Sequence, residues 1–230
     1  MVRQMKGKFY GVSVGPGDPE YMTLKAVRTL KECPVIAAPR TEKRKSVALE
    51  IAGSVVDLNE KEILYLDFLM GRDQKAAEAR HRALAELAAE KLDEGKNVAM
   101  LSLGDASVYA TYGYLQRLLR AQGYETETIA GVPSFCACAA KLGVSLTSAR
   151  LPLRIIPGGY PGIETELGAE GTKVIMKQGK GLDRVKAALK KCGLLEKARI
   201  VENCGLKGER ICRHPDQREY GYFSTIIIGE

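Results

Sequence analysis

Apolar segments typical of strands alternate with amphipathic segments typical of helices along the first 130 residues. The predicted strands lie at residues 9–14, 34–38, 63–66, 98–103 and 126–129. The predicted helices lie at residues 22–31, from about 46, 73–94, 109–119 and from about 134. The segment at 98–103 is continuously apolar, as expected for a strand covered on both faces. This order predicts a parallel or mixed sheet with helices on both faces.

The most regular helical pattern spans residues 73–94. Leu84, Ala88 and Leu92 lie on one stripe, which is typical of a helix with one face in a core. Asp73 is the expected N-cap, and Gly95 is expected to end the helix.

The pattern changes after Leu151, where strand segments dominate. They lie at residues 153–156, 173–176, 199–203, 209–212 and 223–228, with one clear helix at 182–191. No helix separates the last two strands, which predicts antiparallel pairing. We therefore expect an α/β fold of two α/β domains with mixed sheets, one at residues 1–130 and the other at 131–230.

Composition places the chain among globular proteins. Its 230 residues are 45% hydrophobic and 27% charged, and the net charge is +7 with a pI of about 9.0. The densest basic run, Lys43 to Lys45, lies next to Arg40; it is either a solvated face or an attraction for a polyanionic partner. The chain has no Trp and four Phe, which disfavours a surface for stacking nucleic-acid bases. A basic nucleic-acid-binding module remains the alternative from a different class.

Cysteine and histidine usage disfavours a structural metal site. Of the six cysteines, Cys136 and Cys138 form only a C-x-C and the others lie far apart, there is no C-x-x-C pair, and there are two histidines, so a structural zinc site is not expected. The first residues contain no apolar stretch long enough for a signal or a membrane span. We expect a cytoplasmic protein with free thiols, no metal and no membrane contact.

Three glycine-bearing loops follow predicted strands. They contain Gly15-Pro16-Gly17-Asp18, Gly104-Asp105 and Gly131-Val132-Pro133. None matches the G-x-G-x-x-G or Walker pattern. In open α/β sheets ligands bind outside the carboxyl ends of strands, so these loops predict a ligand crevice; alternatively, the glycines only permit tight turns.

Taken together, these loops and their surroundings resemble the tetrapyrrole methylase family. The resemblance rests on five segments in this order: GVSVGPGDPEYMTLKAVRTLKE, LSLGDASVYATYGYL, IAGVPSFCACAAKLG, TKVIMKQGK and YFSTIIIGE. Tyr109, Tyr112 and the closing Tyr222-Phe-Ser-Thr225 are most similar to the branch that methylates C-20 of precorrin-2 or cobalt-factor II. The chain departs from the family at Ala106, where a proline is usual, and at Ala110, where a serine is usual.

The resemblance implies two α/β domains with S-adenosylmethionine in the cleft between them, and S-adenosylhomocysteine as its product. The implied cofactor-binding residues are Pro16, Gly104, Asp105, Val108, Tyr109, Ser134, Phe135, Met176, Asn203 and Thr225. It also implies a homodimer and a tetrapyrrole substrate with many carboxylates. Methyltransferases for uroporphyrinogen-III or precorrin-4 are the nearest alternatives.

The chemistry that the resemblance implies needs neither a metal nor a covalent nucleophile. A sulfonium is an activated methyl donor, so the protein mainly aligns the methyl group with the attacking carbon. Asp105 is the candidate catalytic carboxylate, which stabilises positive charge or accepts a proton; alternatively, it only caps the following helix. The predicted substrate-binding residues are Asp18, Arg40, Lys45 and Tyr112.

Overall fold

The computed structural model describes residues 5–41, 45–69, 73–178, 181–213 and 220–229. The chain divides into two compact units, Met1–Pro133 and Ser134–Glu230. The boundary expected from the sequence, between residues 130 and 131, lies close to this division. No helix in the described ranges is both long and apolar enough to cross a membrane.

The first unit contains a five-stranded sheet in the order β3-β2-β4-β1-β5. Every strand pair in it is parallel. The strands are β1 (Phe9–Ser13), β2 (Val35–Thr41), β3 (Glu62–Phe68), β4 (Val98–Ser102) and β5 (Thr126–Ile129). The helices are η1 (Pro19–Tyr21), α1 (Leu24–Glu32), α2 (Val47–Gly53), α3 (Gln74–Asp93) and α4 (Tyr112–Ala121).

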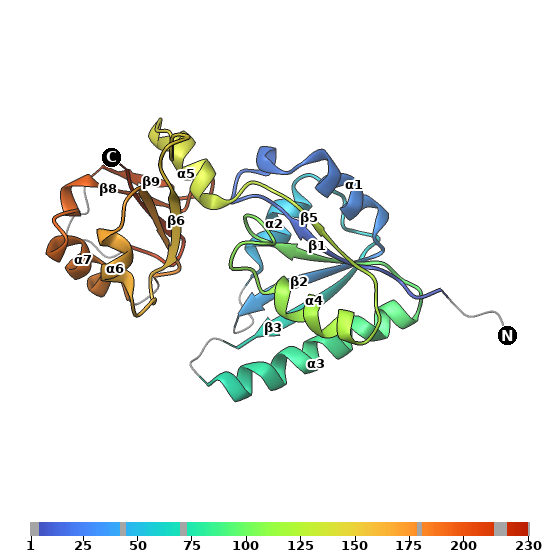
Figure 1. Cartoon of the computed structure of the whole chain (residues 1–230). Coiled ribbons are helices and arrows are strands. Elements are labelled where there is room, and N and C mark those ends of the chain that lie inside the picture. Colours follow the sequence, from blue (N-terminus) through green and yellow to red (C-terminus); the bar gives the residue numbers. More distant parts are fainter. Residues whose placement is uncertain (1–4, 42–44, 70–72, 179–180, 214–219, 230) are drawn as a thin grey trace. The chain divides into compact units, whose positions relative to one another are not determined.

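Helices cover both faces of this sheet, as the sequence predicts (Figure 1). On one face α3 and α4 pack on Phe9, Met100 and Leu66 in a core that also contains the rings of Phe68, Tyr112 and Tyr124. On the other face α1 packs on β1, and α2 packs on β2 and β4. All five residues of β4 are buried, which explains its continuously apolar sequence.

The second unit contains a mixed sheet in the order β6-β7-β10-β8-β9. The strands are β6 (Leu153–Pro157), β7 (Thr172–Met176), β8 (Ala198–Glu202), β9 (Arg210–Cys212) and β10 (Ser224–Ile228). The helices are α5 (Ser134–Leu142), α6 (Ile163–Gly168), α7 (Leu182–Lys191) and η3 (Leu195–Lys197). The β6–β7 pair is parallel, and the others are antiparallel. Helices α6 and α7 cover one face, and α5 packs on β10.

Three sequence predictions differ from the structure. The last two strands do not pair with each other, because β10 lies between β7 and β8, and β9 pairs with β8. Strand β2 does not end at residue 38 but continues through Pro39 to Thr41. Beyond Ala37 it pairs only with β3, so the missing N–H of Pro39 removes no hydrogen bond to β4. Helix α4 starts at Tyr112 rather than 109, because Tyr109 has a left-handed backbone with φ of 49°.

Candidate functional site

The three glycine-bearing loops meet at the carboxyl ends of β4, β1 and β5. These strands are neighbours in the sheet and parallel, so their loops emerge at the same edge. Gly15 and Gly104 form an isolated bridge, with N–O distances of 3.2 and 2.7 Å. The Ser13 hydroxyl donates to the Ile129 carbonyl at 2.7 Å and accepts from the Ala106 N–H at 2.9 Å. One serine thus joins all three loops.

Close approach of the backbones requires glycine at position 131. A Cβ there would lie 2.3 Å from the Ser13 Cβ and 3.1 Å from the Gly104 carbonyl oxygen. Gly15 and Gly104 have φ of 73° and 76°, which side chains disfavour. The glycines therefore do more than permit turns, because Gly131 lets the third loop lie against the other two.

Asp105 ties the second loop to the third. Its side chain is buried, and Oδ2 accepts from the Gly131 N–H at 2.7 Å. Oδ1 accepts from the Ser107 N–H at 2.8 Å and from the Ser107 hydroxyl. Burial raises the pKa of Asp105, but the hydrogen bonds from Ser107 and Gly131 outweigh it, so the pKa is lowered. Asp105 is therefore a fixed anion and a weak proton acceptor.

The other predicted cofactor residues of the first unit lie in the same loops. Pro16 and Gly104 are buried, and Val108 is half-buried. Tyr109 is 43% exposed, and its left-handed backbone is rare for an aromatic residue. Left-handed residues cluster at binding sites, which agrees with the place of Tyr109 at this edge.

In the second unit, Met176, Asn203 and Thr225 lie at one end of the sheet. Met176 is the last residue of β7, and Asn203 directly follows β8. Thr225 is the second residue of β10, which runs between these two strands and antiparallel to both. The Asn203 N–H donates to the Phe223 carbonyl at 2.9 Å. Asn203 also has a left-handed backbone, with φ of 52°. Ser134 and Phe135 begin α5 and are half-buried and buried.

Besides the Ser46 hydroxyl, two buried polar side-chain atoms, one in each unit, lack a hydrogen-bond partner among the described residues. They are the Ser102 hydroxyl at the end of β4 and the Gln178 Oε1, two residues after β7. The Gln178 Nε2 donates to the Ser224 carbonyl at 2.8 Å, so its oxygen is held in place. Leaving a buried polar atom unpaired is unfavourable. A ligand rich in amino and hydroxyl groups, such as S-adenosylmethionine, would supply donors, so the residues present fit the implied cofactor.

Two predicted substrate-binding residues are occupied by other contacts. Tyr112 is 1% exposed, stacks on Phe9, and donates its hydroxyl to the Glu127 carbonyl. The ring of Tyr112 fills the core space beside Gly11, whose Cβ would lie 2.4 Å from it, so the structure places Tyr112 in the core and not at a surface for the substrate. Arg40 forms a two-pronged ion pair with Asp67, at 2.7 and 3.1 Å.

The remaining predicted substrate residues lie at the surface or at its edge. Lys45 is exposed, while Lys43 and Arg44 of the same basic run lie outside the described residues. Asp18 is half-buried and accepts from the Glu20 N–H at 3.0 Å, which caps η1. Lys45 therefore keeps its charge available to a ligand, whereas Asp18 supports the first loop.

Sequence reasoning missed three residues of the site: Ser13, Ser102 and Gln178. Ser13 and Ser102 are the last residues of neighbouring strands and lie in register. A polar residue at the end of each apolar strand segment could have identified both from the sequence. Gln178 had no such signal, because its role depends on the long-range contact with Ser224.

Residues 8–216 match the family of Tetrapyrrole (Corrin/Porphyrin) Methylases. The chain belongs to this family. It is 32% identical to the cobalt-precorrin-2 C(20)-methyltransferase of Salmonella typhimurium over 233 residues, which cover 98% of each chain. It is 38% identical to a probable cobalt-precorrin-2 C(20)-methyltransferase of Methanocaldococcus jannaschii, over 74% of this chain and 72% of the relative.

Solved structures of the family share the fold. A cobalt precorrin-4 methyltransferase has a TM-score of 0.77 at 19% identity, covering 96% of this chain and 94% of its own. A uroporphyrin-III C-methyl transferase of Thermus thermophilus, complexed with S-adenosylhomocysteine, has a TM-score of 0.71 at 25% identity, covering 97% and 92%. The predictions of an α/β tetrapyrrole methylase fold, of C-methyl transfer and of S-adenosylmethionine as cofactor are confirmed.

Proposed function

We propose that this methylase transfers a methyl group from S-adenosylmethionine to C-20 of precorrin-2 or cobalt-factor II in cobalamin biosynthesis. The observation that carries the proposal is the full-length likeness to the Salmonella C(20)-methyltransferase. By contrast, a precorrin-4 C(11)-methyltransferase of Pseudomonas aeruginosa matches 60% of the chain. A chloroplastic uroporphyrinogen III methyltransferase of Arabidopsis thaliana matches 61%. The C-20 reaction is therefore favoured over these alternatives.

We further propose that the three loops of the first unit hold the methionine part of the cofactor. Pro16, Gly104, Asp105, Val108 and Tyr109 form this part of the site. Their backbones are fixed by the Gly15–Gly104 bridge and by Ser13. When bound, the cofactor supplies an activated methyl group, and a fixed site favours alignment with the carbon that attacks it.

The adenosine part is proposed to contact the second unit, through Met176, Asn203 and Thr225, with Ser134 and Phe135 nearer the middle. The Gln178 Oε1 joins this set as an acceptor, because it is buried and without a described partner. This assignment extends the sequence-based prediction by one residue.

Asp105 is proposed to act by charge rather than by taking a proton. Its pKa is lowered by Ser107 and Gly131 despite burial, so it stays ionised near neutral pH. A fixed anion stabilises positive charge that develops on the macrocycle as the methyl group arrives.

The substrate's carboxylates are proposed to bind Lys45 and the part of the Arg40 guanidinium that Asp67 leaves free. Asp67 engages Nε and one terminal nitrogen of Arg40, and a guanidinium has five N–H donors. We also propose that the enzyme works in the cytoplasm as a homodimer, as is expected for its family.

A transfer assay tests the proposed function. The enzyme is incubated with labelled S-adenosylmethionine and, separately, with precorrin-2, cobalt-factor II, uroporphyrinogen-III or precorrin-4. Label is expected in precorrin-2, in cobalt-factor II or in both, and an R40Q/K45Q variant is expected to raise KM more than it lowers kcat. Transfer only to uroporphyrinogen-III or precorrin-4 would overturn the proposal.

A further inference from the structure

A pocket of about 620 Å³ lies in the second unit, at the end of its sheet away from the predicted cofactor residues. Thr172 and Arg199, which line it, stand at the starts of β7 and β8, whereas Met176 and Asn203 stand at their ends. At ~3.3 Å per residue, Thr172 and Met176 are about 13 Å apart along β7. Volumes of ~300–1,000 Å³ are usual for small-molecule sites.

The pocket lies on the face of this sheet that α5 contacts. Ile226 and Ile228 face α6 and α7, so Ile227 and Thr225 face the other side. Helix α5 packs on β10 and contacts Thr225 through Cys138. Ile227 and its cross-strand neighbour Arg199 both line the pocket; Ile227 is buried, whereas Arg199 is exposed.

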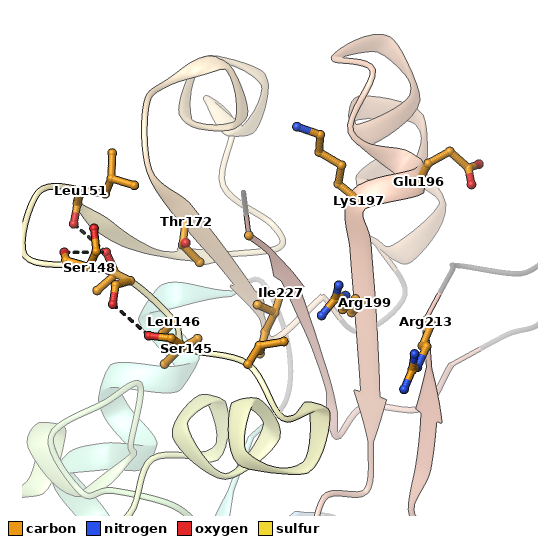
Figure 2. A pocket seen from close by; sticks show the side chains of 13 residues that line it. Ser145, Leu146, Ser148, Leu151, Thr172, Glu196, Lys197, Arg199, Arg213 and Ile227 are labelled. Atoms are coloured by element: carbon orange, nitrogen blue, oxygen red, sulfur yellow. Dashed lines mark hydrogen bonds between the residues drawn. The ribbon is translucent and has the colours of Figure 1, made fainter.

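Positive charge gathers on one wall of the pocket. Lys197, Arg199 and Arg213 line it, and all three are exposed. Within the described residues, none of their side chains has an ion-pair or hydrogen-bond partner. Figure 2 shows Lys197 and Arg199 on the pocket side of β8, whereas the one acidic lining residue, Glu196, points away. As far as the structure describes the chain, the side chains of this wall therefore carry positive charge that no neighbouring carboxylate pairs.

The opposite wall is a short loop that offers hydroxyl groups. Ser145 donates to the Thr147 carbonyl at 3.0 Å, and Thr147 donates to the Leu151 carbonyl at 2.7 Å. These bonds, drawn among the residues in Figure 2, hold the loop compact. Ser148 and Thr172 add hydroxyl groups, and Ile227 forms an apolar floor. Cationic groups together with hydroxyls are the usual partners of carboxylate and phosphate oxygens.

We propose that this pocket is a second ligand site, which binds a small anion with two or three carboxylate or phosphate groups. Its cations engage the anionic groups, and the hydroxyls of Ser148 and Thr172 complete the contacts from the other side. The site is separate from the proposed methyl-transfer site and does not depend on which tetrapyrrole is methylated.

Calorimetric titration of the full chain tests this proposal, with citrate as the carboxylate probe and inorganic pyrophosphate as the phosphate probe. At low salt we expect one equivalent of one or both anions to bind, with an affinity that falls as salt is added. Losing two charge-assisted contacts in a K197Q/R199Q variant should weaken binding by about tenfold or more. The affinity for S-adenosylhomocysteine should not change, which also shows that the variant is folded.

The matched control is K75Q/K190Q, which removes two exposed positive charges on α3 and α7. It should bind the anions as the wild type does. The proposal is overturned if neither anion binds the wild type, if K197Q/R199Q binds them equally well, or if both double variants lose affinity equally. If, in that first case, K197Q/R199Q dissociates a dimer, the pocket is instead a contact between copies of the chain.

Discussion

At the scale of single residues, the candidate site contains two kinds of buried polar atoms: those with hydrogen-bond partners and those without a partner in the part of the chain that the structure describes. Asp105 belongs to the first kind, because one carboxylate oxygen accepts from Ser107 of its own loop and the other accepts from Gly131 of the neighbouring loop. Ser102 and Gln178 belong to the second kind. The first kind holds the loops in place, and the second leaves acceptors and donors for a ligand.

An Asp105→Asn variant tests the electrostatic role. The amide removes the negative charge, so we expect turnover at saturating substrate to fall by about tenfold or more. The measurement is kcat together with the Kd for S-adenosylhomocysteine, which separates charge stabilisation from loss of the loop structure. Asp73→Asn, at the N-cap of α3, is the control and should keep wild-type kcat. Wild-type turnover in Asp105→Asn would show that the carboxylate only ties the loops.

Ser102→Ala tests whether the unpartnered hydroxyl contacts the cofactor. A typical hydrogen bond contributes ~0.5–1.5 kcal/mol, so the Kd for S-adenosylhomocysteine should rise by about two- to tenfold. Ser46 is a close control, because its hydroxyl is also buried and without a described partner, but it lies at the N-cap of α2. Equal affinities in Ser102→Ala and Ser46→Ala would remove Ser102 from the site.

At the scale of elements, neighbouring parallel strands bring the loops together and hydrogen bonds lock them. Two strand-end residues, Ser13 and Ser102, are in register on β1 and β4. Lys8, Lys25 and Glu127 add ion pairs that join β5 to α1 and to the start of β1. The Gly15–Gly104 bridge and the Ser13 hydrogen bonds therefore hold the loops together, and the ion pairs hold the edge strand β5.

Gly131→Ala tests the close packing of the loops. A Cβ 2.3 Å from the Ser13 Cβ forces the loops apart, and overpacking of this kind costs ~1–3 kcal/mol. Urea denaturation should show this loss, with weaker binding of S-adenosylhomocysteine. Gly113→Ala is the control, because nothing lies within 4 Å of its Cβ on α4, and it should be neutral or slightly stabilising. Unchanged stability and affinity in Gly131→Ala would contradict the packing argument.

Glu127 predicts a pH dependence of stability. Hydrogen-bonded Lys25 and Lys8 lower the pKa of Glu127 from 4.5 to about 2. The folded-state pKa lies below the unfolded one, so the stabilisation is complete above pH 4.5 and is lost as the pH falls towards 2. These pairs are partly exposed, so the effect at pH 7 is small, ~0–1 kcal/mol. In urea denaturation between pH 7 and 3, the free energy of unfolding should fall less steeply with decreasing pH for Glu127→Gln than for the wild type. The same steepness in both proteins would contradict this prediction.

The sequence predicted correctly those elements whose apolar stripe, cap and stop residue all lie within the element or next to it. Helix α3 runs from Gln74 to Asp93 with Asp73 as its cap, because its stripe, cap and stop all lie within the segment. The six-residue α6 was not predicted, since it is short and has no side-chain cap. The place of β10 between β7 and β8 was also missed, because pairing order depends on contacts distant in the sequence.

At the scale of the whole molecule, the chain consists of two α/β units, each with one five-stranded sheet. The loop residues predicted for the cofactor gather at one end of each sheet. Within each unit, the order of predicted strands was enough to predict this grouping. The core position of Tyr112 and the Arg40–Asp67 ion pair could not be predicted, because both depend on side-chain packing. Lys45 and the basic side chains of the second-unit pocket are exposed members of the cationic excess that gives the net charge of +7.

The central claim is methyl transfer to C-20 of the macrocycle. The most direct measurement uses S-adenosylmethionine with a ¹³C-labelled methyl group, incubated with the enzyme and precorrin-2 or cobalt-factor II, followed by NMR of the product. We predict one new methyl signal, coupled to the meso carbon C-20. A methyl group on any other carbon, or no transfer to either substrate, would contradict the account.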